Sequence, residues 1–345
     1  MLCYWQRDIV VMTMKKKIEL PLLEPMYSTY HHQAPGTAII ERNPSIRNWY
    51  LNQVMILNCS RKFLTGYTSP ELNIVDAHWK ENPYFHKSKH SIRFYNGYVH
   101  PIIRNMIDAG YYVFFSGIDD YYVQGKTWYH ERHFCHDGMI CGYNRENKTY
   151  CIYAYDNNWV YRKFWTPQKA FDAGRRAMFR EGIYGKLYGL RPKDERISFD
   201  PQTALSKICE YLDSDMDKYP ENGEGKIYGI VVQEYIAKYL DKLLDGSIPY
   251  ERIDGRIFRL IWEHKKAMLE RIILIEQSYG YPDSISSRYR NVVTYANQMR
   301  MLYASHLVKR RDSVLVSIRK MLIELIQSEY RLLSELTYDV RGGKQ

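Results

Sequence analysis

The sequence predicts an α+β protein in two parts, an antiparallel sheet domain followed by a bundle of α-helices. Up to about residue 200, short β-type runs are separated by Gly, Asn and Asp, which is typical of hairpin-connected strands. Beyond Pro201, apolar residues recur at spacings of three and four, which indicates amphipathic helices. Because the stretch 191–196 is polar and separates the two patterns, we expect a first domain over residues 1–195 and a helical domain over residues 200–345.

The first domain carries a clear hairpin signal. Strand-forming residues at 139–143 and 150–155 flank the polar turn 144–148, and this spacing predicts two paired antiparallel strands. The other expected elements are a helix over 99–108, a strand over 111–115, a helix from Thr166–Pro167 to about 179, and a strand over 183–190.

The second domain is expected to consist of long helices. Gly-containing turns at 245–247 and 280–283 interrupt the apolar periodicity. The expected helices cover 227–244, 250–279, 284–307 and 311–336. An antiparallel bundle is the simplest architecture that buries one apolar stripe from each of them.

Composition restricts the classes of partner. The 345 residues carry a formal net charge of +10 and include 33 Tyr. The basic residues are dispersed and no nucleic-acid recognition motif accompanies them, so an acidic protein partner is expected rather than nucleic acid. No run approaches the ~20 apolar residues of a membrane span, and six cysteines in a chain this long do not suggest a disulfide framework. We therefore expect a cytoplasmic protein without a membrane partner.

Four residues have the order and spacing of a thiol active site. Gln53 lies six residues before Cys59, His136 lies 77 residues after Cys59, and Asp156 follows 20 residues later. A thiol needs a neighbouring imidazole to become a thiolate, and the imidazole needs a carboxylate or amide to fix its tautomer. A side-chain amide upstream of the thiol is suited to donate to an oxyanion. The predicted hairpin would bring the His136 and Asp156 strand ends together.

This pattern resembles the papain-like bacteriocin-leader peptidases and, more closely, the butirosin biosynthesis protein H N-terminal family. The resemblance covers about residues 45–190 and implies a papain-like catalytic domain. The family is associated with natural-product and antibiotic gene clusters, and its founding activity transfers an acyl group from a carrier protein to an amine. One member of the wider group forms the amide bonds of closthioamide, and a relationship to that enzyme is a further expectation.

The resemblance implies a role for each residue. Cys59 would be the nucleophile, His136 the general acid and base, Asp156 the orienting carboxylate, and Gln53 an oxyanion donor. The expected reaction is amide formation, in which an acyl group passes from the phosphopantetheine thioester of an acidic acyl or peptidyl carrier protein to Cys59 and then to a small amine. No bound cofactor and no metal are expected. The residues expected to line the substrate pocket are Asp119, Asp120, Tyr121 and Tyr122.

Several alternatives stay open at this point. Water as the acceptor would make the protein a cysteine peptidase or amidase, and a core Cys59 would make it a non-catalytic interaction protein. His133 competes with His136 as the base. A zinc site is a less favoured alternative. The residues of metal-ligand type in this part of the sequence are His133, Cys135, His136, Cys141 and Cys151. The helical domain would dock the carrier, or cover the first domain and form a homodimer.

Overall fold

The computed structural model describes residues 16–39, 43–66, 68–91, 98–215, 225–280 and 284–342. Cys3 lies outside these ranges. The contacts divide the chain into two compact units. Of the described residues, those up to Pro21 and within His86–Arg191 form the sheet unit, and those within Leu22–Phe85 and from Pro192 onward form the helical unit. The second boundary agrees with the predicted linker, but the expected first domain is divided, because residues 22–85 pack with the helices.

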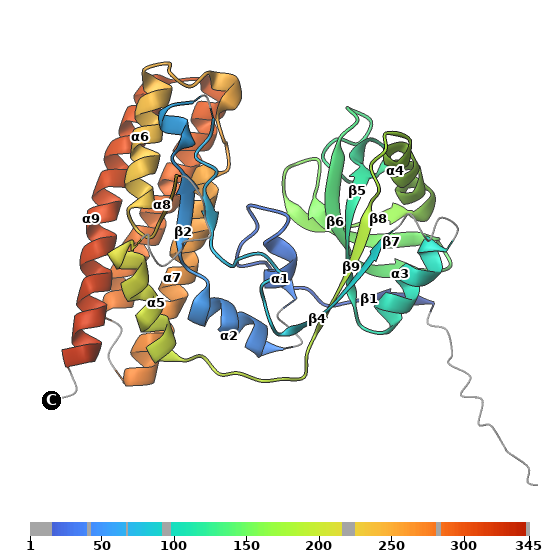
Figure 1. Ribbon diagram of the computed structural model, residues 1–345, viewed down its shortest axis with the longest axis horizontal. Helices are drawn as coiled ribbons and strands as arrows, with labels where there is room; N and C mark the ends of the chain where they lie inside the picture. Colours follow the sequence, from blue (N-terminus) through green and yellow to red (C-terminus); the bar gives the residue numbers. More distant parts are fainter. Residues whose placement is uncertain are drawn as a thin grey trace, which may run out of the picture. The chain divides into compact units, whose positions relative to one another are not determined.

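The sheet unit is built on one antiparallel sheet (Figure 1). Its strand order is β4-β9-β5-β6-β7-β8, and β1 pairs with β6. The predicted hairpin is confirmed as the β6–β7 pair, in which Tyr143 lies opposite Tyr150. The strands are β1 (Lys17–Glu19), β4 (Phe85–Ser91), β5 (Tyr112–Asp119), β6 (Cys135–Asn144), β7 (Thr149–Tyr155), β8 (Tyr161–Pro167) and β9 (Lys186–Pro192). Strand β8 was not predicted.

Two helices, α3 (Val99–Asp108) and α4 (Gln168–Arg180), pack against this sheet. His100 of α3 links both to it, since its ring nitrogens lie 2.6 Å from the Tyr150 hydroxyl and 2.8 Å from Asp172 of α4. Gly174 lets α4 approach the end of β5, because a Cβ at this position would lie only 2.7 Å from the Asp119 carbonyl oxygen. The helix thereby fixes the strand end that carries the candidate site.

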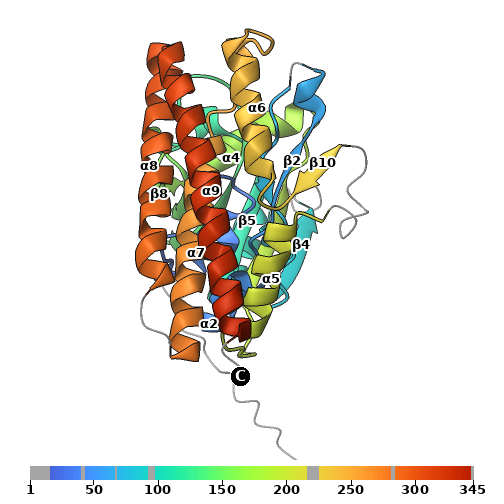
Figure 2. The ribbon, with the colours of Figure 1, turned by 90° about the vertical axis from the view of Figure 1, so that its left-hand side faces the viewer.

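Within the described residues, the helical unit contains five long helices, whose course can be followed in Figures 1 and 2. Their buried faces are mainly aliphatic. They are α5 (Pro201–Asp213), α6 (Val232–Leu244), α7 (Ile257–Tyr279), α8 (Ile285–Lys309) and α9 (Asp312–Gly342). The four predicted helices correspond to α6–α9, although Lys226–Tyr228 forms strand β10 instead of a first helical turn. In the described part of the chain, no helix combines the length and the apolar character of a membrane span.

Residues 22–85 join this unit through buried polar contacts as well as through a small sheet. That sheet has the order β10-β2-β3. The Arg271 guanidinium of α7 donates to carbonyl oxygens at the end of α2, including those of Tyr50 and Leu51 at 2.8 Å. Glu263 of α7 accepts hydrogen bonds from the backbone and side chains of Ser28 and Thr29. The elements concerned are α1 (Ala34–Ala38), α2 (Pro44–Gln53), β2 (Leu57–Ser60) and β3 (Asn73–Ile74).

Candidate functional site

Two adjacent aspartates at the end of β5 each hold a histidine. Asp119 and Asp120 are fully buried. Strand pairing places Asp119 opposite Cys135, so the residues around the start of β6 lie beside the aspartates. His133 Nδ1 lies 2.6 Å from Asp119 Oδ2, and His136 Nδ1 lies 2.8 Å from Asp120 Oδ2. The sheet register therefore creates two Asp–His pairs at one end of the β5–β6 strand pair.

A buried lysine lies beside the Asp120–His136 pair. Lys126 Nζ lies 3.2 Å from Asp120 Oδ1 and donates a 2.6 Å hydrogen bond to the Asp137 carbonyl oxygen. The same nitrogen lies 3.3 Å from His136 Nδ1. The Lys126 and Asp120 side chains are 1% and 0% exposed, whereas that of His136 is 20% exposed. The imidazole is thus the member of the cluster that solvent reaches.

Burial shifts the pKa values of two groups beside His136. Burial lowers the pKa of Lys126, and the Asp120 carboxylate beside it opposes that effect. Burial also raises the pKa of Asp137, against the influence of His136 and Lys126. A carboxylate at Nδ1 favours the tautomer in which Nδ1 carries the proton, which leaves Nε2 as the basic nitrogen of His136.

The second pair borders a cavity of about 400 Å³. Asp119 accepts backbone hydrogen bonds from Tyr121 and Phe134, so its carboxylate organises the loop as well as His133. The His133 side chain is 63% exposed and stacks on Tyr121 with ring centroids 4.4 Å apart. Tyr122 lines the cavity together with Asp119 and His133. Of the four residues predicted to line a pocket, Asp119 and Tyr122 do so, while Asp120 and Tyr121 support the histidines.

Asp156 is engaged in its own hairpin. Its Oδ1 accepts hydrogen bonds from the backbone N–H groups of Asn158 and Val160 at 2.8 and 2.9 Å, and its Oδ2 forms an ion pair with Arg162. Its backbone also bridges that of Lys126. The carboxylate that holds His136 Nδ1 is therefore that of Asp120, and Asp156 connects the β7–β8 turn to the Lys126 loop.

Cys59 and Gln53 belong to the helical unit. Cys59 lies in β2 opposite Ile227 of β10 and is 0% exposed. Burial raises the pKa of its thiol to about 12, which favours the neutral thiol over the nucleophilic thiolate. Gln53 is the last residue of α2 and is half-buried. Neither residue shares a unit with His136, so their predicted roles stay predictions.

We expect iodoacetamide to alkylate Cys59 in the folded protein about 100-fold more slowly than Cys135, because Cys135 is exposed and Cys59 is buried. Peptide mass spectrometry over a time course measures both rates in one sample. In urea the two rates should become similar. Rapid alkylation of Cys59 in the native state would contradict this expectation and support its predicted role as the nucleophile.

The remaining ligand-type residues near the site do not gather around one centre. Cys141 and Cys151 are buried on neighbouring strands with their sulfur atoms 3.5 Å apart, whereas His133 and His136 contact aspartates. Among the described residues, no group of three or more His, Cys, Asp or Glu side chains is arranged to hold a metal ion. The residues considered as zinc ligands therefore form a cysteine–cysteine contact and two histidine–aspartate contacts.

A chain of aromatic contacts begins at His136. The Phe134 ring meets the His136 ring edge-on at 5.1 Å, and Trp128 lies 6.2 Å from Phe134 and 5.5 Å from Trp159. The Arg132 guanidinium lies 3.7 Å from the Trp128 ring centroid. Trp159 has a positive φ of 59°, an unfavourable conformation for an aromatic residue, and is 57% exposed. Phe134 thus contacts the imidazole, and Trp128, Trp159 and Arg132 extend the contacts away from it.

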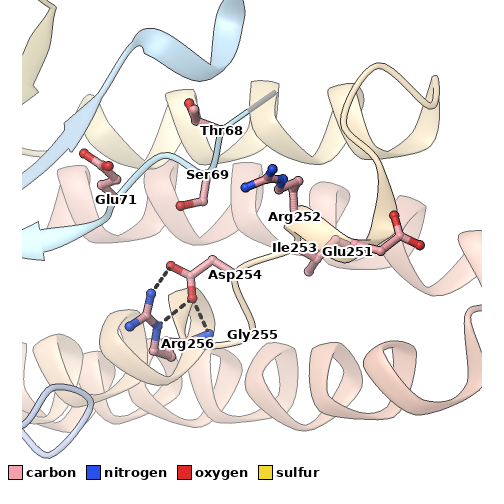
Figure 3. A pocket seen from close by; sticks show the side chains of 9 residues that line it. All are labelled: Thr68, Ser69, Glu71, Glu251, Arg252, Ile253, Asp254, Gly255 and Arg256. Atoms are coloured by element: carbon pink, nitrogen blue, oxygen red, sulfur yellow. Dashed lines mark hydrogen bonds and ion pairs between the residues drawn. The ribbon is translucent and has the colours of Figure 1, made fainter. Parts of the chain in front are cut away.

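The helical unit has a cavity of about 480 Å³, shown in Figure 3, and no Asp–His pair is among its lining residues. Arg252 and Arg256 line it together with Glu71, Glu251 and Asp254. Asp254 and Arg256 engage each other through two hydrogen bonds of 2.8 and 3.0 Å. The mixed charges indicate no single class of ligand, and we place the candidate active site in the sheet unit.

Comparison of the chain with models of known protein families and with curated protein sequences finds no match.

Proposed function

We propose that this protein is an acyl-transfer enzyme that forms an amide from an acyl thioester and a small amine, with His136 as the general base. The observation that carries the proposal is the hydrogen bond between His136 Nδ1 and the buried Asp120 carboxylate. The spacing that resembles the butirosin biosynthesis protein H N-terminal family supports the choice of acyl transfer. A papain-like relationship of the sheet unit is part of the same proposal.

The proposed chemistry needs one proton carrier. As the amine attacks the thioester carbonyl, the C–N bond forms and His136 Nε2 accepts a proton from the nitrogen. When the C–S bond breaks, the imidazolium returns this proton to the leaving thiolate, which gives an amide and a free thiol. Asp120 stabilises the imidazolium, and the Lys126 ammonium lies 3.2 Å from the other oxygen of the same carboxylate.

The surroundings of His136 favour an apolar or aromatic acyl group. Phe134, Trp128 and Trp159 offer ring faces and edges, and such contacts add to the burial of apolar area. The proposed donor is the phosphopantetheine thioester of an acidic carrier protein, because the net charge of +10 would steer such a partner toward the enzyme.

The proposal replaces the covalent route through Cys59 with direct transfer. A thiol whose pKa is raised to about 12 supplies little thiolate at neutral pH. Direct attack by the amine needs only the base and the bound thioester, and the resident groups around His136 can support it. A thioester on Cys59 stays a prediction that the same experiment tests.

The deciding experiment incubates the full chain with benzoyl- or acetyl-pantetheine and a panel of small primary amines, with an enzyme-free control for spontaneous aminolysis. We expect amide product, detected by mass spectrometry, from both the wild type and Cys59→Ala at similar rates. Loss of product in Cys59→Ala, with an acyl adduct on wild-type Cys59, would establish the covalent route. Free carboxylic acid as the only product would identify a hydrolase, and no product at all would overturn the proposal.

A further inference from the structure

Three cationic side chains form a row along the exposed side of α4. Lys169, Arg176 and Arg180 are exposed, whereas Phe171 and Met178 on the opposite side of the helix are buried. Intervals of seven and four residues correspond to two turns and one turn of helix, so this cationic row extends over about 16 Å of one helix face. The basic residues are dispersed in the sequence, and the helix brings three of them together.

The acidic residue of α4 is engaged elsewhere. Asp172 is the only Asp or Glu in the helix, and its carboxylate lies 2.8 Å from His100 Nε2 and 3.5 Å from Nε of the buried Arg175. It precedes Arg176 by one turn and attenuates that one charge. Within the described residues, no member of the cationic row forms an ion pair. The row therefore presents unneutralised positive charge to solvent.

The stability of α4 accounts for only one member of the row. Arg180 lies in the last turn of the helix, where a cation interacts favourably with the helix dipole. Lys169 lies in the first turn, where the same dipole repels a cation. Arg176 and Arg180 are four residues apart, so their like charges repel each other on the helix surface. A bound anionic partner would relieve both repulsions.

The cationic row ends beside the candidate site. Arg180 lines the cavity of about 400 Å³ together with Asp119 and His133 of the second Asp–His pair. Glu181 lines this cavity too, so the excess of positive charge lies along the helix rather than inside the cavity. A partner held by the row would thus place its own reactive group near the Asp–His pairs.

Exposed apolar side chains adjoin the same end of α4. Phe179, Ile183 and Tyr184 are 43%, 41% and 44% exposed. The rings of Phe179 and Tyr184 meet edge to face with their centroids 5.3 Å apart. Single exposed apolar residues are ordinary, whereas a group of them beside a row of charge is typical of a protein contact surface. An aliphatic side chain such as Ile183 gives no favourable contact to a phosphate backbone.

We propose that the cationic row and the apolar residues after it are the docking surface for the acidic carrier protein that delivers the acyl thioester. The inference rests on the proposed function, because it names the surface that this donor would use. Residues 86–191 contain 16 Lys and Arg but only 9 Asp and Glu, so the sheet unit as a whole attracts an acidic partner. An acidic helix carries carboxylates at intervals of three, four and seven residues on one face, which match the intervals of the row.

Calorimetric titration of the full chain with a phosphopantetheinylated acyl carrier protein of fatty-acid synthesis tests the docking without turnover. We expect binding in the micromolar range that weakens as salt is added, because the contact is small and charged. Lys169→Glu/Arg176→Glu should weaken it by at least about tenfold. Lys309→Glu/Lys320→Glu is the matched control, since it changes the net charge equally at exposed residues of the helical unit. No binding to the wild type, or equal weakening in both variants, overturns the proposal.

A kinetic comparison separates the docking from the reaction. With the benzoyl-loaded carrier protein as donor, Lys169→Glu/Arg176→Glu should lower kcat/KM for amide formation by at least about tenfold, mainly through KM, relative to its value with benzoyl-pantetheine. Equal effects on both donors would refute the docking and leave the proposed function standing. Carrier binding without amide from either donor would refute the function alone. A single-stranded oligonucleotide that binds more tightly than the carrier, and more weakly to the same variant, would assign the row to nucleic acid and overturn the proposal.

Discussion

Replacing Glu329 by Gln should lower the free energy of unfolding of the helical unit by about 3–5 kcal/mol, because the change leaves a buried lysine without its counter-ion. Lys265 and Glu329 are both 0% exposed and form an ion pair of 2.6 Å between α7 and α9. Urea unfolding of the full chain, followed by far-ultraviolet circular dichroism, measures the change. Since whole domains are stable by only about 5–15 kcal/mol, the effect should be evident at 25 °C.

Glu329 organises contacts from four other helices of the bundle. Besides Lys265, its carboxylate accepts hydrogen bonds from Gln233 of α6 at 2.8 Å, Tyr211 of α5 at 3.3 Å and Tyr289 of α8 at 2.5 Å. Burial lowers the pKa of Lys265, and Glu329 opposes this effect. Gln keeps the size but removes the charge and one acceptor oxygen, so the predicted loss combines the lost charge with the lost hydrogen bonds.

Two controls separate this contribution from a general effect of substitution. Glu335 lies on α9 like Glu329, and Glu335→Gln removes its exposed ion pair with Arg288 of α8. This substitution should lower the free energy of unfolding by less than about 1 kcal/mol. The double variant Lys265→Met/Glu329→Leu removes both charges and should be less destabilised than Glu329→Gln. A double variant that is less stable than the single one would show that the ion pair itself stabilises the bundle.

Local patterns predicted the elements of this fold better than their assignment to units. The helix over 99–108 has the predicted bounds, because Pro101 and the following apolar residues specify it locally. Strand β8 was missed because Arg162 and Lys163 interrupt its apolar residues. Residues 22–85 were assigned to the wrong part, because the contacts that decide the matter, such as that of Arg271 with the end of α2, join residues more than 200 positions apart.

Spacing in the sequence likewise did not predict which side chains contact one another in the candidate site. The sequence placed His136 at the start of a strand and drew attention to the Asp119–Asp120 loop. It did not indicate that Asp120 contacts His136. Several acidic residues lie near this end of the β5–β6 pair, and spacing alone does not specify which carboxylate contacts the imidazole. Lys126 was not predicted, since a single lysine in a loop usually faces solvent, whereas here it is buried beside Asp120.

Asp120→Asn should lower kcat for amide formation by about 10²–10⁴-fold and leave KM nearly unchanged, because the change removes the carboxylate that fixes the tautomer of His136 and stabilises its protonated form. His136→Gln should cause a loss of the same order. If the two residues act as one unit, the double variant should be no slower than His136→Gln alone. Steady-state kinetics with an acyl-pantetheine donor and an amine measures these rates.

Asp119→Asn is the matched control for this prediction, because it makes the same chemical change one residue away and affects the His133 pair instead. We expect it to reduce kcat by less than about tenfold. Asp120→Asn also leaves Lys126 buried without a carboxylate, so the thermal unfolding midpoint of each variant must be recorded beside its kinetics. An additive double variant would show that Asp120 acts through stability rather than through His136. A larger loss in Asp119→Asn than in Asp120→Asn would transfer the role of base to His133, whose Nδ1 lies 2.6 Å from Asp119 and which borders the cavity of about 400 Å³.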